Sequence, residues 1–248
     1  MTPDRLLAGL DAIAATLSTR PQALALLALG SCGVETQRLD AFSDLDFFVI
    51  VEESAKQNFI VNLDWLTCGK PLVFAHRNTV DGWKTLDADG VFCEFAVFHP
   101  SQLAHIPFAP GRIVWARDGF DIALLQPSFE REIDDLDWLS IEATTNILVG
   151  LKRYLRGEKL SAWRCICGDA CEQVCLLLQA SSGADQFNPW RRLEIGNPVI
   201  ASQLQKAMIE NDPARVARGL IKILSERPSV PRALLNEVTT YLDLCDAR

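Results

Sequence analysis

The hydrophobic pattern of this chain changes near Pro127, and the change limits the folds open to it. Before Pro127, short apolar runs at 23–29, 45–52 and 91–98 have the length of buried strands and end at Gly, charged or turn-forming residues. After Pro127, the apolar residues recur at helical spacing. A run of strands followed by a run of helices is typical of an α+β protein.

The change also divides the chain into two predicted domains, residues 1–126 and 127–248. Pairs such as Asn197-Pro198 and Asp212-Pro213 separate the helices of the second domain, because proline cannot continue a helix from its preceding turn. The predicted helices span 3–20, 54–66, 129–156, 161–181, 199–211, 213–225 and 231–245, and the predicted strands span 23–29, 45–52, 72–77, 80–86, 91–98 and 111–119.

Charge and hydropathy exclude several classes of protein. The net charge of −8 argues against a sequence-independent nucleic-acid binder, which needs a basic stripe to displace counterions from phosphates. No apolar run approaches the roughly 18 residues of a membrane span. The first residues lack the layout of a signal peptide, and eight cysteines without an export signal indicate reduced thiols. We therefore expect a cytoplasmic protein that binds neither nucleic acid nor membrane.

The most informative segment joins a glycine turn to a pair of carboxylates. Gly30-Ser31 follows an apolar strand, and Asp44 and Asp46 stand at alternate positions where the next strand begins. Glycine lets the backbone approach a ligand closely, and a hydroxyl with neighbouring N–H groups at a helix start can hold phosphate. Alternate carboxylates on one strand share a side and repel each other unless a cation lies between them. Mg²⁺, which prefers carboxylate and phosphate oxygens, is the natural cation for this arrangement.

A third carboxylate, Glu94, interrupts the apolar run 91–98. An ionised Glu buried in such a run is costly without a partner. Either Glu94 faces solvent or pairs with a Lys or Arg, or it points with Asp44 and Asp46 into a metal site. In the second case Glu94 could ligate a metal ion and accept a proton from an attacking hydroxyl.

Gly30-Ser31, Asp44-Leu45-Asp46 and the later Glu94 together resemble the motif of the nucleotidyltransferase superfamily that includes DNA polymerase β. The resemblance covers residues 28 to 94 and is greatest to the small lincosamide and aminoglycoside nucleotidyltransferases. It implies a mixed sheet flanked by helices in the first domain, followed by a helical domain that forms one wall of an acceptor cleft.

The resemblance also implies an activity. A nucleoside monophosphate would pass from an NTP, with ATP as the expected donor, to a hydroxyl of a small molecule, and pyrophosphate would leave. Asp44, Asp46 and Glu94 would hold two Mg²⁺ ions, with Glu94 as or beside the general base. Ser31 and the backbone near Gly30 would hold the β- and γ-phosphates. Ser43 and Lys84 are further candidates for nucleotide binding, although Ser43 could serve only the turn and Lys84 could be a solvated surface lysine.

Several alternatives stay open at this point. The acceptor could be an aminoglycoside or lincosamide antibiotic, which makes antibiotic resistance a candidate role. It could instead be a protein, modified by a regulatory AMPylating enzyme of antitoxin type. The chain could also bind nucleotide without turnover, and it could be a monomer or a homodimer.

Two features of the second half have no assigned role. Trp190, Arg191 and Arg192 could bind a nucleotide or could form a structural cap. Four cysteines crowd one predicted helix, where small core side chains are a better interpretation than a metal site because neither a CxxC motif nor a histidine accompanies them. These cysteines are Cys165, Cys167, Cys171 and Cys175.

Overall fold

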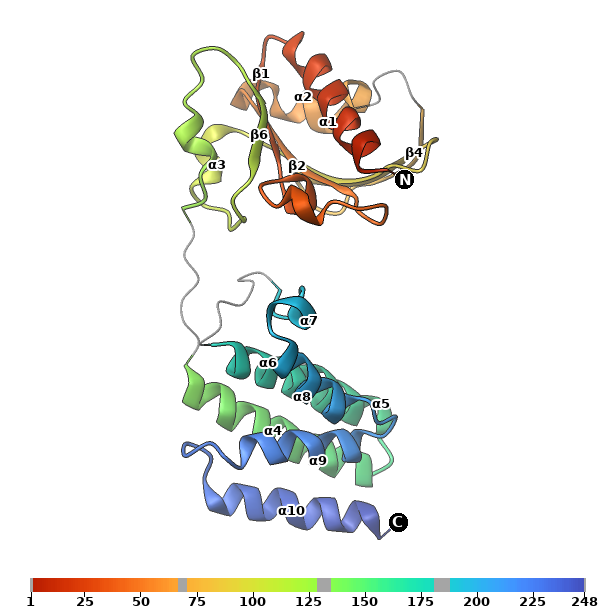
Figure 1. The fold of residues 1–248 in the computed structure, drawn as a ribbon, viewed down its shortest axis with the longest axis vertical. Helices are drawn as coiled ribbons and strands as arrows, with labels where there is room; N and C mark the ends of the chain where they lie inside the picture. Colours follow the sequence, from red (N-terminus) through yellow and green to blue (C-terminus); the bar gives the residue numbers. More distant parts are fainter. Residues whose placement is uncertain (1, 67–70, 129–134, 181–187, 248) are drawn as a thin grey trace. The chain divides into compact units, whose positions relative to one another are not determined.

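The computed structural model describes residues 2–66, 71–128, 135–180 and 188–247. The chain divides into two compact units, residues 1–130 and 131–248. The first unit holds a six-stranded mixed sheet with flanking helices, and the described part of the second is helical (Figure 1). The predicted α+β class is therefore confirmed.

The strands of the sheet follow the predicted apolar runs closely. Their order is β3-β4-β5-β2-β1-β6, so β2 and β5 lie at the centre. The β2–β5 pair is parallel, and all the other neighbouring pairs are antiparallel. The strands are β1 (Ala23–Ala28), β2 (Leu45–Val51), β3 (Leu72–His76), β4 (Gly82–Asp87), β5 (Phe92–Phe98) and β6 (Arg112–Ala116).

The alternation of side chains along β2 decides which face of the sheet carries the polar residues. Leu45, Phe47 and Val49 pack into a core with helix α1 (Pro3–Ser18) and with Phe59 of α2 (Lys56–Val61). Successive side chains of a strand point to opposite faces. Phe48 and Ile50 accordingly pack into a second core, with Leu103 of α3 (Pro100–Leu103). Asp46 shares this second face with Phe48.

One predicted helix is shorter than expected, and another is only a 3₁₀ turn. Residues 54–66 form η3 (Glu53–Ala55), α2 and η4 (Leu63–Trp65), because Asn62 adopts extended angles, φ −105° and ψ 105°, that end α2. The helix expected after Gly30-Ser31 is only a 3₁₀ turn, η1 (Gly30–Cys32). Two further 3₁₀ turns are η2 (Thr36–Arg38) and η5 (Ile122–Leu125).

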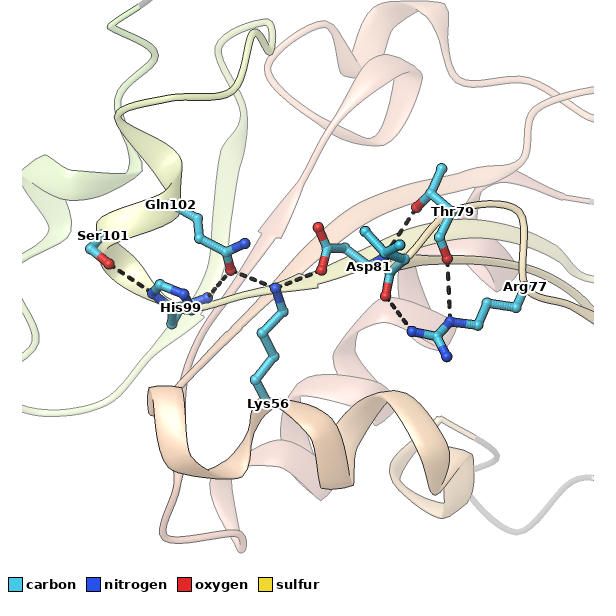
Figure 2. Close-up of polar contacts among 8 residues, drawn as sticks. Lys56, Arg77, Thr79, Asp81, His99, Ser101 and Gln102 are labelled. Atoms are coloured by element: carbon cyan, nitrogen blue, oxygen red, sulfur yellow. Dashed lines mark hydrogen bonds and ion pairs between the residues drawn. The ribbon is translucent and has the colours of Figure 1, made fainter.

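A network of hydrogen bonds ties α2, the residue before β4 and α3 together at the carboxyl end of β5 (Figure 2). Lys56 Nζ contacts Asp81 Oδ1 at 2.5 Å and Gln102 Oε1 at 2.7 Å. Gln102 Oε1 also accepts from the backbone N–H of His99, and Ser101 Oγ lies 2.8 Å from His99 Nδ1. These contacts lie at the end of the sheet opposite to the end where Asp46 lies.

The helical unit has its own core, and its elements follow the predicted ones with two differences. The 161–181 helix contains a π-helical turn, and the short helix α7 was not predicted. Residues 129–134 and 181 of the predicted helices lie outside the described residues. No helix in the described ranges has both the length and the apolar character needed to cross a membrane. The elements are α4 (Leu136–Leu155), α5 (Lys159–Trp163), the π turn η6 (Arg164–Ala170), α6 (Cys171–Gln179), α7 (Leu193–Gly196), α8 (Pro198–Met208), α9 (Pro213–Leu224) and α10 (Arg232–Asp246).

Candidate active site

Two of the predicted carboxylates lie side by side on the sheet. Asp46 of β2 and Glu94 of β5 are register partners in the parallel pair, so their side chains project from the same face. This is the face opposite to α1, because Leu45 and Cys93, the preceding residue of each strand, pack into the core beneath α1. The strand pairing thus brings together two residues that are 48 positions apart in the sequence.

Gly30 lies directly against Asp46. Its φ of +55° is a left-handed conformation that favours glycine, and a Cβ at this position would meet Asp46 Oδ2 at 2.7 Å. The backbone N–H of Leu29 donates to the carbonyl oxygen of Asp46 at 2.7 Å and fixes the turn to β2. The close approach that glycine permits at this turn is therefore an approach to the carboxylate of Asp46.

Cys32 lies within the electrostatic influence of both aspartates of the motif. Burial is the main cause of the raised pKa of the Cys32 thiol, and the negative charges of Asp46 and Asp44 raise the pKa further, while a hydrogen bond with Ser31 lowers it. The Cys32 thiol also donates to the backbone carbonyl of Asp44 at 3.1 Å. Ser31, Asp44 and Asp46 consequently gather around one buried side chain.

Glu94 is not an unpartnered carboxylate in an apolar setting. Its side chain is 43% exposed, and Glu94 Oε2 lies 3.2 Å from Lys84 Nζ. Asn78 Nδ2 donates to Glu94 Oε1 at 3.2 Å. Lys84 is the register partner of Glu94 on β4, which explains the ion pair. Glu94 therefore pairs with a lysine, as the first of the two alternatives for this residue stated, and it also lies beside Asp46.

Ser43 has a local role in the turn before β2. Its hydroxyl accepts from the backbone N–H of Asp40 at 3.0 Å and donates to Asp40 Oδ1 at 3.1 Å. Such side-chain contacts are typical of Asx and Ser turns. The turn holds the chain just ahead of Asp44, and a phosphate contact of Ser43 would have to replace these bonds.

The residue types at this site fit Mg²⁺, although their arrangement is not that of a closed metal site. Carboxylate oxygens are the donors that Mg²⁺ prefers, and glycine leaves Asp46 accessible where a Cβ would fill the space. Across the described residues, however, no three His, Cys, Asp or Glu side chains cluster in a way that could hold a metal. A metal at Glu94 would have to compete with Lys84.

Two further polar residues of the site were not singled out from the sequence. Asn78, which contacts Glu94, follows β3 in a loop that has no recognisable motif. Arg112 of β6 donates from Nε to the carbonyl oxygen of Cys32 at 3.2 Å, which places a guanidinium beside the Gly-Ser turn. Only the antiparallel pairing of β6 with β1 reveals this proximity, because Arg112 pairs with Ala28.

The unassigned residues of the helical unit lie in structural settings. Trp190 packs partly against the helical core, and Arg192 adopts left-handed angles immediately before α7. Cys171 and Cys175 are fully buried members of the same core, as the sequence suggested. Burial raises the pKa of Cys171 to about 12 and that of Cys175 to about 11, so both thiols are protonated at neutral pH.

Comparisons with known proteins give distant likenesses. No protein-family model and no curated protein matches the chain. Among solved structures, the chain is similar to a nucleotidyltransferase-like protein from Exiguobacterium sibiricum, at 12% identity and a TM-score of 0.37, over 98% of this chain and 80% of that one.

Two other similar structures are adenyltransferases. One is an aminoglycoside 6-adenyltransferase from Bacillus subtilis, at 11% identity and a TM-score of 0.35, over 94% of this chain and 90% of that one. The other is a spectinomycin adenyltransferase from Enterococcus faecialis, solved with ATP and spectinomycin, at 11% identity and a TM-score of 0.35, over 95% of this chain and 98% of that one. At these identities the likenesses assign no role to a residue, and the site must be judged by its own chemistry.

Proposed function

We propose that this protein is a nucleotidyltransferase that moves a nucleoside monophosphate from an NTP, with ATP as the donor, to a hydroxyl of a small molecule. The observation that carries the proposal is the register of Asp46 with Glu94 on two parallel strands, with the Gly30 turn packed against Asp46. This juxtaposition gives a physical basis to the superfamily motif that the sequence resembles.

Each residue of the site has a role in this proposal. Asp44, Asp46 and Glu94 would hold two Mg²⁺ ions, which when bound neutralise the charge of the triphosphate and of the leaving pyrophosphate. Ser31 and the backbone at Gly30 would hold phosphate oxygens. Lys84 would leave Glu94 and neutralise a phosphate charge. Breaking the Lys84–Glu94 ion pair would cost little free energy, because an exposed pair is weak. Glu94 would then be free to accept the proton of the acceptor hydroxyl.

The acceptor class follows from the resemblance and from the charge of the chain. Residues 1–125 carry 9 basic and 15 acidic side chains, a net charge of −6. An acidic surface attracts cationic molecules, so we propose a cationic small molecule such as an aminoglycoside as the first acceptor to test. Antibiotic modification in the cell is part of this proposal.

The test is thermal stability with ATP, GTP, CTP or UTP, each with and without Mg²⁺. A ligand that binds only the folded state raises the melting temperature by mass action. We expect a Mg²⁺-dependent rise that Asp46→Asn abolishes and that Asp11→Asn, an exposed aspartate of α1, leaves unchanged. Pyrophosphate release with a panel of aminoglycosides and lincosamides then identifies the acceptor. No rise with any nucleotide would contradict the proposal.

One observation favours a second candidate, a module that binds nucleotide without turnover. Glu94 is held by Lys84 and Asn78, which would leave two carboxylates for the metal. A Mg²⁺-dependent thermal shift without pyrophosphate release from any acceptor, protein acceptors included, would favour this second function.

A further inference from the structure

A row of polar side chains continues the candidate site beyond Glu94, on the face of the sheet opposite to α1. Glu94 of β5 is the register partner of Lys84 on β4, and Lys84 is the register partner of His76 on β3. Register partners on neighbouring strands project from the same face of a sheet. Together with Asp46 on β2, these three residues form one polar row across β2, β5, β4 and β3.

An apolar row runs beside the polar row, two residues away from it on each of three strands. It consists of Phe92, Leu86 and Phe74, which are register partners on β5, β4 and β3. Phe74 is 48% exposed and the other two are half-buried, and none of the three packs into the hydrophobic cores that the described residues form. The rings of Phe74 and His76, one from each row, lie 6.5 Å apart between centroids. Apolar groups that gather uncovered beside a polar site are typical of a ligand-binding surface.

The direction of the proposed reaction indicates which ligand this surface would receive. The acceptor oxygen bonds to the α-phosphorus, the bond from that phosphorus to the β-phosphate oxygen breaks, and the hydroxyl proton passes to Glu94. Attack and departure are in line, on opposite sides of the phosphorus. The Gly30 turn follows β1 and Glu94 is on β5, and these two strands flank β2 on opposite sides. Because Gly30 and Ser31 would hold the departing phosphates, the acceptor would enter over β5, β4 and β3.

We propose that the apolar row binds the acceptor, and that the acceptor presents a sugar-type ring whose C–H face lies on Phe74 and whose hydroxyl edge faces the polar row. This inference rests on the proposed nucleotidyl transfer and adds the kind of ring and its orientation. A sugar ring has an apolar C–H face and a polar hydroxyl edge, so it matches an apolar row that lies beside hydrogen-bonding groups. The negative face of an aromatic ring also attracts the slightly positive C–H groups.

Lys84 restricts the chemistry of the ring edge that faces the polar row. Its ammonium group lies in that row, 3.2 Å from Glu94 Oε2, and it repels a second cation at short range. The facing edge would therefore carry hydroxyl groups rather than ammonium groups. The amino groups of a cationic acceptor would lie elsewhere on the molecule, away from Lys84.

The experiment titrates the full chain, without nucleotide, with kanamycin, an aminoglycoside built of sugar-type rings, and separately with spermine, a linear polyamine. Backbone amide NMR shifts locate the binding and give the dissociation constants. Kanamycin is expected to shift the amides of Phe74, Ala75 and Leu86. Spermine is expected to leave these amides unchanged, because it is a polycation without a ring. Absence of these shifts with kanamycin, or equal shifts with both molecules, would overturn the inference.

Three variants test the contact with Phe74, which is exposed on an edge strand and can be replaced without opening a core. Phe74→Ala should weaken kanamycin binding roughly 3- to 10-fold, whereas Phe74→Tyr keeps the ring and should bind like wild type. Val61→Ala removes an exposed apolar side chain from α2, which packs on the other face of the sheet, and should change nothing.

The same three variants should keep the Mg²⁺-dependent thermal shift with nucleotide, because the acceptor surface is separate from the phosphate site. Equal kanamycin binding by Phe74→Ala and wild type would overturn the inference and leave the proposed nucleotidyl transfer untouched. A missing nucleotide shift in wild type would instead contradict the nucleotidyl transfer itself, so the two failures are distinguishable.

Discussion

Asp46 and Glu94 face the same side of the sheet from equivalent positions on two parallel strands, and Gly30 lies against the first of them. If they share a bound Mg²⁺, loss of either carboxylate charge should reduce turnover far more than stability. We expect Asp46→Asn and Glu94→Gln each to lower kcat/KM by more than roughly 100-fold, with the melting temperature within a few degrees of wild type.

The measurement for this pair is pyrophosphate release at several Mg²⁺ concentrations. Both substitutions preserve side-chain shape, so a large effect reports the lost charge. Asp118→Asn, in an exposed turn of the same unit, serves as the control and should retain full activity. Wild-type activity in Glu94→Gln would remove Glu94 from the mechanism and leave the two aspartates as the metal site.

Gly30 and Gly90 offer a matched pair for separating backbone strain from crowding of the site. Both have left-handed angles, with φ +55° at Gly30 and +83° at Gly90, so alanine strains the backbone by about 1–2 kcal/mol at either position. Only at Gly30 would the new Cβ also meet Asp46 Oδ2, whereas nothing lies within 4 Å at Gly90. We therefore expect both variants to lose stability in denaturant unfolding, but only Gly30→Ala to lose the Mg²⁺-dependent nucleotide shift.

Equal nucleotide binding by these two alanine variants would show that the glycine turn does not contact the nucleotide or its metal. Loss of nucleotide binding in both variants would indicate that their lower stability, measured as a lower unfolding midpoint without nucleotide, weakens binding indirectly.

The Lys84–Glu94 ion pair should matter little for stability and more for nucleotide. The two side chains are 39% and 43% exposed, and exposed pairs contribute about 0–1 kcal/mol. We expect Lys84→Met to change the free energy of unfolding by less than about 1 kcal/mol and to raise the KM for the nucleotide, because a phosphate charge would lose its partner. An unchanged or lower KM would instead identify Lys84 as a competitor of the metal at Glu94.

The sequence predicted the elements of the sheet well because buried strands have a clear apolar signature. The runs containing Phe47 and Phe95 needed no tertiary information, and their stacking within the core at 5.1 Å between ring centroids follows from the parallel register. The segments after Gly30 and Asn62 were harder to predict. Each segment has only a few apolar residues at helical spacing. Tertiary packing, which local propensity does not describe, determines the short 3₁₀ turns found there.

The site shows the same division between local and long-range information. Asp44, Asp46 and the Gly30 turn are close in the sequence, so their proximity was predictable. The contacts of Glu94 with Lys84 and Asn78 depend on strand order, in particular on β4 lying next to β5. Arg112 is 80 residues from Cys32 in the sequence, and it contacts the Gly-Ser turn because β6 pairs with β1.

Three cysteines of the helical unit, Cys167, Cys171 and Cys175, should react slowly with alkylating agents. Burial, the largest cause, raises the pKa of Cys167 to about 11, that of Cys171 to about 12 and that of Cys175 to about 11. At pH 8 the thiolate fraction is then roughly 100-fold below that of an ordinary cysteine, so labelling should be slower by at least this factor. Peptide mass spectrometry after brief iodoacetamide treatment measures the labelling of each cysteine, with guanidinium-unfolded protein as the control. Fast labelling of Cys171 would contradict its placement in the core.

Tyr154 and Asp212 join two helices of the second unit, and their contact should make stability depend on alkaline pH. Tyr154 Oη donates to Asp212 Oδ2 at 2.5 Å, while Asp212 Oδ1 caps α9 by accepting from the N–H groups of Ala214 and Arg215. The hydrogen bond to Asp212 is the main cause that raises the pKa of Tyr154 to about 12, from an ordinary value near 10.

A raised pKa means that the folded state holds this proton more tightly than the unfolded state does. The stabilisation is therefore fully present below about pH 10 and is lost as the pH rises towards about 12. Tyr154→Phe should lower the free energy of unfolding by about 1.5 kcal/mol at pH 8, the lower end of the range for a hydrogen bond to a charged group. The difference between wild type and Tyr154→Phe should shrink at pH 11, as measured by urea unfolding at both pH values. A difference that stays constant from pH 8 to pH 11 would show that Asp212 does not control the tyrosine proton, and that the packing of the ring alone stabilises the contact between α4 and α9.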